Sequence, residues 1–112
     1  MMRRFTEDAS RIFLACGSTD FRKQIPGLIA TVTLQFNLDP YNGSCVFIFC
    51  NKKRDSIKVL RYDENGFLLA TKKLLDHMKF QWPHWNIWCQ VLLNFYKQIN
   101  SHLQIICKVI NL

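Results

Sequence analysis

The sequence predicts a small α+β domain: one strand, one helix packed on a face of a sheet, and an antiparallel meander of three or four strands. Short apolar runs of strand length, bounded by turn-forming residues, recur along the chain and predict the strands. A stretch with helical spacing lies between the first run and the others. The length of 112 residues leaves room for one core, and a hydrophobic fraction of 49% is typical of globular proteins.

The first strand is predicted at residues 11–16, before the break formed by residues 17–20. Pro26 fits the first turn of a helix, because its missing N–H removes no hydrogen bond there. The predicted helix runs from about Pro26 to Asn37, and its buried face consists of Leu28, Ile29, Val32 and Phe36. The β-branched residues 31–33 weaken its intrinsic propensity, so packing must hold this helix.

The meander begins with Cys45 to Cys50, a continuous apolar run typical of a central strand. Ser56 to Tyr62 and Phe67 to Lys73 flank the turn at residues 63–66, whose Asn-Gly pair is a strong hairpin signal. Strands joined by such short loops pair antiparallel. Residues 80–83 are compatible with a further edge strand, with Trp82 as a packing anchor.

The composition changes after Pro83, so we expect one domain over residues 1–83 and an atypical apolar tail over residues 84–112. All eight acidic residues precede the tail. Apolar residues at every fourth position favour a helix between Ile87 and Ile99, whereas residues 105–110 favour a strand. These local signals conflict, and the structure of the tail stays undecided.

The net charge of +7 indicates an anionic partner, namely nucleic acid, an anionic membrane or an acidic protein. No stretch approaches the roughly 20 apolar residues of a membrane span. The N-terminal residues lack the apolar stretch of a signal peptide. We therefore expect a cytoplasmic protein without a membrane partner.

The five cysteines indicate buried thiols in a reducing compartment, because their number is odd and no pair has CxxC spacing. The three histidines complete no zinc-binding pattern. We expect neither a metal nor a cofactor.

Catalysis is not indicated by the acidic residues. Two-metal phosphoryl transfer needs several converging carboxylates, whereas Asp39, Asp63 and Glu64 lie in turn-forming sequences. No local motif supports a Cys–His nucleophile. We predict a protein without enzymatic activity or a small-molecule substrate.

Basic residues predict a surface that binds DNA phosphates without reading sequence. They occur in the turn before the helix, in the loop after the central strand and on the following strand: Arg22, Lys23, Lys52, Lys53, Arg54, Lys58 and Arg61. Tyr62 or Phe67 could offer stacking faces nearby. Two alternatives stay open: the loop is a solvated turn, and Arg22 forms a turn with Asp20 that fixes the entry to the helix.

The same segments resemble a known family. The matching pieces are residues 12–23, 27–28, 38–40, 46–60, 63–67 and 80–83. In this order and spacing they resemble the TnpB accessory proteins of the insertion sequence 66 family of bacterial transposable elements. These proteins are distinct from the RNA-guided nucleases of the same name.

The resemblance implies a non-catalytic role in DNA transposition, beside a separate transposase that supplies the catalytic carboxylates. DNA binding is the leading expectation, and an adaptor that contacts the transposase is the alternative. The chain departs from the family pattern at Phe21, at Pro26 and throughout the acid-free tail. We therefore hypothesise a frameshift from about residue 84, which would make this copy an inactive remnant; the nucleotide sequence of the gene tests this.

Overall fold

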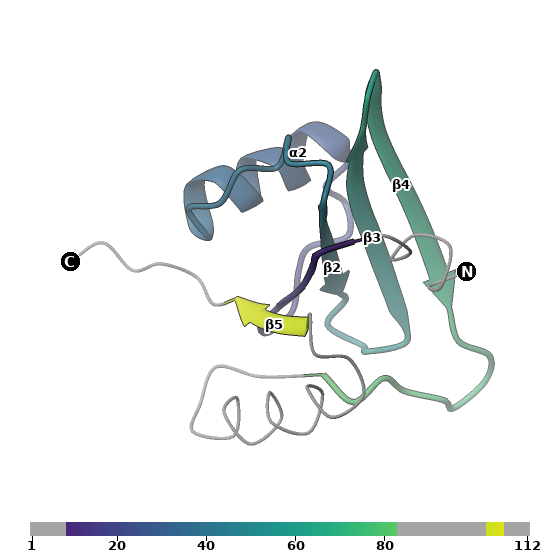
Figure 1. Ribbon diagram of the computed structural model, residues 1–112. Coiled ribbons are helices and arrows are strands. Elements are labelled where there is room, and N and C mark those ends of the chain that lie inside the picture. The colour runs from purple at the N-terminus through teal and green to yellow at the C-terminus, as the bar shows by residue number, and fades with distance from the viewer. Residues whose placement is uncertain (1–8, 83–102, 107–112) are drawn as a thin grey trace.

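A five-stranded sheet with a helical segment on one face forms the fold of residues 9–82 and 103–106, which the computed structural model describes (Figure 1). The sheet order is β4-β3-β2-β1-β5. The strands are β1 (Arg11–Ala15), β2 (Cys45–Cys50), β3 (Ser56–Asp63), β4 (Gly66–Lys73) and β5 (Leu103–Ile106), and the helical segment comprises α2 (Ile25–Ala30) and η1 (Thr31–Gln35).

The α+β prediction is confirmed, and β2, β3 and β4 form the expected antiparallel meander. The hairpin closes at Asp63 and Gly66, as its turn residues predict. β1 lies outside this antiparallel meander. It pairs parallel with β2, from Arg11↔Cys45 to Leu14↔Ile48. Parallel neighbours require a long crossover, which the chain between the two strands supplies together with α2.

The predictions for the C-terminal part have mixed outcomes. β5 overlaps the residues that favour a strand and pairs parallel with β1. The expected edge strand near Pro83 is wrong over residues 80–82, which belong to no strand. The predicted helix between Ile87 and Ile99 lies outside the described residues.

Both faces of the central strands are buried, which explains why β1 and β2 read as continuous apolar runs. Alternate residues enter two clusters. Phe13 and Phe47 lie in the cluster on the helix side, where Leu28 and Val32 complete the packing. The opposite cluster contains Ile12, Leu14, Val46, Ile48, Ile57, Val59 and Trp82. The strand period of two therefore divides the core between the faces.

The helix occupies the predicted position, but its second half is a π-helix. The Thr31 and Thr33 hydroxyls donate to the carbonyl oxygens of Gly27 and Ile29, at 3.0 and 2.9 Å. Such bonds compete with the regular helical bonds of the backbone. In the widened turn, the Phe36 N–H donates to the carbonyl of Thr31, five residues earlier, at 3.3 Å. Asn37 then adopts a φ of 56° and ends the segment.

Trp82 is the packing anchor that the sequence predicts. Its side chain is buried in the cluster opposite the helix. The indole Nε1–H donates a hydrogen bond of 2.7 Å to the carbonyl oxygen of Ala15, the last residue of β1. This bond fixes the end of the described chain before residue 83 to the central part of the sheet.

Trp82→Phe should lower the free energy of unfolding by about 1–3 kcal/mol, because it leaves the buried carbonyl of Ala15 without this donor. Urea unfolding followed by circular dichroism measures the change. Tyr62→Phe is the matched control, since it removes an exposed hydroxyl that donates to the Glu64 carbonyl. Its effect should stay within about 0.5 kcal/mol. Equal stability of the two variants would contradict the role of Trp82.

Candidate nucleic-acid interface

The loop between β2 and β3 carries three exposed cations, Lys52, Lys53 and Arg54. Side chains at both of its ends hold it. Asn51 Oδ1 accepts bonds of 3.1 Å from the N–H groups of Asp55 and Ser56, and Asn51 Nδ2 donates to Asp55 Oδ1 at 2.6 Å. The three cations therefore lie on a braced turn rather than on an unsupported loop.

Backbone bonds attach this loop to two neighbouring segments. The Thr19 N–H donates to the Cys50 carbonyl at 2.8 Å, which brings the β1–α2 loop beside it. The N–H groups of Leu74 and Phe80 donate to the carbonyls of Asp55 and Arg54, both at 2.7 Å. Residues from three parts of the sequence thus meet at the end of β2.

Arg22 forms the turn that the sequence offers as one alternative. Its backbone N–H donates to Asp20 Oδ1 at 2.9 Å, and its guanidinium reaches Asp20 Oδ2 at 2.7 Å. The hydrogen bonds from Arg22 are the main cause that lowers the pKa of Asp20 to about 2. The Arg22 side chain is 92% exposed, but the adjacent carboxylate balances its charge.

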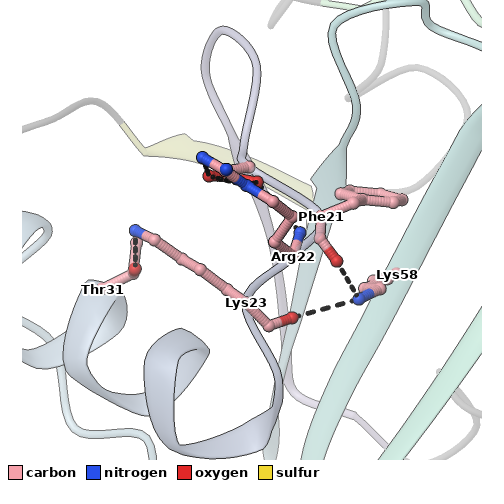
Figure 2. Close-up of polar contacts among 6 residues, drawn as sticks. Phe21, Arg22, Lys23, Thr31 and Lys58 are labelled. Atoms are coloured by element: carbon pink, nitrogen blue, oxygen red, sulfur yellow. Dashed lines mark hydrogen bonds and ion pairs between the residues drawn. The ribbon is translucent and has the colours of Figure 1, made fainter.

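Lys23 and Lys58 lie on either side of the same turn, and their ammonium groups have partners within the protein (Figure 2). Lys23 Nζ donates to Thr31 Oγ1 at 2.9 Å. A Cβ at Gly27 would lie 3.1 Å from Lys23 Cβ, so the glycine allows this side chain to lie against the helix.

Lys58 is only 7% exposed. Its Nζ donates to the carbonyl oxygens of Phe21 and Lys23, at 2.8 and 3.1 Å, and lies 5.0 Å from the centroid of the Phe21 ring. The ammonium connects β3 to the β1–α2 loop (Figure 2). The structure therefore gives Lys58 a role in packing.

Arg61 is not brought together with the loop cations. It follows Lys58 by three residues on β3, so its side chain leaves the opposite face of the sheet. Its Nε donates to the Gly43 carbonyl at 3.0 Å. Tyr62 and Phe67 are also distant from the loop, because they pack against Tyr41 at the hairpin end of β3.

A cleft of about 630 Å³ lies between the β1–α2 loop and the β2–β3 loop. Its lining comprises Ser18, Thr19, Asp20, Phe21, Asn51, Lys52, Lys53, Asp55, Ser56 and Lys73. Two candidates from the sequence, Lys52 and Lys53, are in this set. Lys73 was not a candidate, although the hairpin register that places it opposite Ser56 could have indicated it.

Metal and thiol chemistry receive no support from the described part of the chain. No group of three His, Cys, Asp or Glu residues there could hold a metal ion. Cys16, Cys45 and Cys50 are buried thiols. Burial raises the pKa of the Cys50 thiol to about 11, which disfavours the reactive thiolate. None of the helices in residues 9–82 has the length and apolarity needed to cross a membrane.

Lys58→Met should lower the free energy of unfolding by about 2 kcal/mol, because two backbone carbonyls lose a charged donor. Chemical denaturation of the variant and of Lys72→Met provides the comparison. Lys72 is exposed on the neighbouring strand, and its replacement should change the stability by less than about 0.5 kcal/mol. A Lys58→Met variant as stable as the parent would disprove the packing role.

Arg22→Gln should raise the pKa of Asp20 from about 2 towards 3.8. Because folding lowers this pKa, Asp20 contributes stability above pH 3.8 that is lost as the pH falls through about 2. An NMR titration of the Asp20 carboxyl carbon gives the midpoint directly. Lys23→Gln is the control and should shift this pKa less, because the charge of Lys23 contributes least to lowering it. Equal changes of the Asp20 pKa in both variants would show that Arg22 is not the main cause of its low value.

Comparisons with known proteins identify relatives for most of the chain. A family model described as IS66 Orf2 like protein matches residues 10–102. Two uncharacterized proteins of Sinorhizobium fredii (strain NBRC 101917 / NGR234), y4jC and y4hO, are 37% and 36% identical over 73 residues. These matches cover 65% of this chain and about three fifths of each relative. No solved structure shows a significant match.

The family match extends beyond Pro83, the last residue of the resemblance found in the sequence. The frameshift hypothesis therefore rests on the composition of the tail, and the division at residue 83 stays a prediction. The family match covers well over half of the sequence, which confirms the resemblance. The chain belongs to the family of IS66 Orf2-like proteins.

Proposed function

We propose that the protein is a non-catalytic accessory factor in DNA transposition that binds DNA through the β2–β3 loop. One observation carries the proposal: Lys52, Lys53 and Arg54 are exposed together on a braced turn. Within the described residues, none of these three side chains has an acidic partner. Their charge is therefore available to a polyanion. Membership of the IS66 Orf2-like family supports transposition as the process.

The proposed contacts are electrostatic and concern the DNA backbone. Cations on a turn can approach phosphates, and such contacts give affinity without reading the bases. Arg22 is secondary because Asp20 balances its charge. Lys23, Lys58 and Arg61 are left out of the surface, since their cationic groups bond within the protein.

Catalysis of strand transfer is assigned to a separate transposase. The chemistry requires carboxylates that converge on metal ions. In the described ranges, Asp20 and Asp55 approach the same cleft, but each is held by hydrogen bonds from neighbouring side chains. The loop cations fit an assisting role, in which the protein holds DNA for another enzyme.

Replacement of Lys52, Lys53 and Arg54 by Gln should weaken binding to duplex DNA of any sequence. Each lost phosphate contact should reduce the magnitude of the slope of log affinity against log salt by about 1. The slope of the triple variant should therefore be smaller in magnitude by about 3. Fluorescence anisotropy with a labelled duplex over a salt series measures both quantities. Lys72→Gln is the control, because it removes one exposed cation outside the loop.

Absence of binding to any duplex at low salt would overturn the DNA proposal. Capture of the element's transposase by the same protein would then favour the adaptor function. An unchanged salt slope in the triple variant would show that DNA binds elsewhere on the chain.

A further inference from the structure

The cleft between the two loops lies where open sheets commonly bind ligands. β1 and β2 are parallel, and their carboxyl ends lead into the β1–α2 loop and the β2–β3 loop. Ligands of such sheets bind outside the carboxyl ends of the strands. The cleft lined by both loops occupies this position, and Lys73 closes it from the end of β4.

In this cleft, side-chain hydrogen-bond donors are available to a ligand, whereas the carboxylate acceptors already have partners. The hydroxyls of Ser18 and Thr19 and the ammonium groups of Lys52, Lys53 and Lys73 form no hydrogen bond or ion pair within the described part of the chain. Lys73 does lie near enough to Asp55 for its charge to help lower the pKa of that carboxyl. The acceptors are engaged: Asp20 binds Arg22, and Asp55 accepts from Asn51 and Ser56. Three ammonium groups face two carboxylates, one of which Arg22 neutralises. The unoccupied hydrogen-bonding capacity therefore suits an anion.

The size and lining of the cleft restrict the anion further. Its volume of about 630 Å³ lies within the usual range of about 300–1,000 Å³ for small-molecule sites. A cleft of this volume has the size of a small-molecule site, so it admits one unpaired nucleotide but no duplex. Phe21 is the one aromatic residue of the lining, and aromatic rings stack with bases of unpaired strands. A single nucleotide matches the cleft in both volume and chemistry.

We propose that the cleft binds one unpaired nucleotide of a DNA strand. The phosphate contacts Lys73 and the hydroxyls of Ser18 and Thr19, and the base lies against Phe21. This inference rests on the proposed DNA binding and gives it a substrate class: DNA with an unpaired end or a locally opened strand. Lys52 and Lys53 line the cleft and also belong to the loop that contacts the duplex.

The test compares two labelled DNA hairpins of equal duplex sequence, each closed by a non-nucleotide linker so that the loop holds no unpaired base. One hairpin is blunt and the other has a short single-stranded overhang. Anisotropy titration of the intact chain should show at least about fivefold tighter binding to the overhang, as expected for one stacked base. Lys73→Gln should abolish this preference and leave the affinity for the blunt hairpin within about twofold. Lys72→Gln is the matched control, because it changes the adjacent exposed lysine outside the cleft lining, and should retain the preference.

A second variant, Ser18→Ala with Thr19→Val, tests the hydroxyls without removing charge. It retains the backbone bond from Thr19 to Cys50 and should also lose the preference. Blunt and overhanging hairpins bound equally by the parent protein would overturn the cleft assignment and leave the proposed function intact. Binding of a free deoxynucleoside monophosphate without any overhang preference would also overturn it, in favour of a free-nucleotide site. No binding of either hairpin would refute the proposed function itself.

Discussion

The buried ammonium of Lys58 is the interaction on which the arrangement of the two loops depends. It joins β3 to the β1–α2 loop through the carbonyl oxygens of Phe21 and Lys23. Hydrogen bonds to a charged donor are stronger than those between neutral groups. With this connection in place, the turn formed by Asp20 and Arg22 lies beside the β2–β3 loop. The cleft and its lysines exist because these two segments are held together.

The strands and the helix could be predicted from the sequence because local patterns dominate there. Cys45 to Cys50 is apolar at every position, and the Asn-Gly pair marks the hairpin. The parallel pairing of β1 with β2 could not be predicted in the same way. It depends on a long crossover and on burial of both strand faces, which are properties of the assembled sheet. The π-helix of residues 31–35 is likewise not indicated by residue spacing, which fits a regular helix.

The candidate site was predicted only in part, because position in the sequence does not show whether a cation faces solvent. Lys52, Lys53 and Arg54 lie on a turn and are exposed, as their loop composition suggests. Lys58 has the same charge, but the strand alternation places it on the helix side of the sheet. There, backbone carbonyl oxygens accept hydrogen bonds from its ammonium group. Lys73 enters the cleft through the hairpin register, a relation between residues that are distant in the chain.

The contact of Lys23 with Gly27 and Thr31 has a consequence for divergence within the family. The lysine stem lies against the glycine and its ammonium donates to the threonine hydroxyl, so the three positions form one stripe from the β1–α2 loop onto the helical segment. A larger residue at position 27 would displace the stem, and loss of the threonine would remove its acceptor. Substitutions along this stripe should therefore be inherited together, as compensating changes at residues four positions apart.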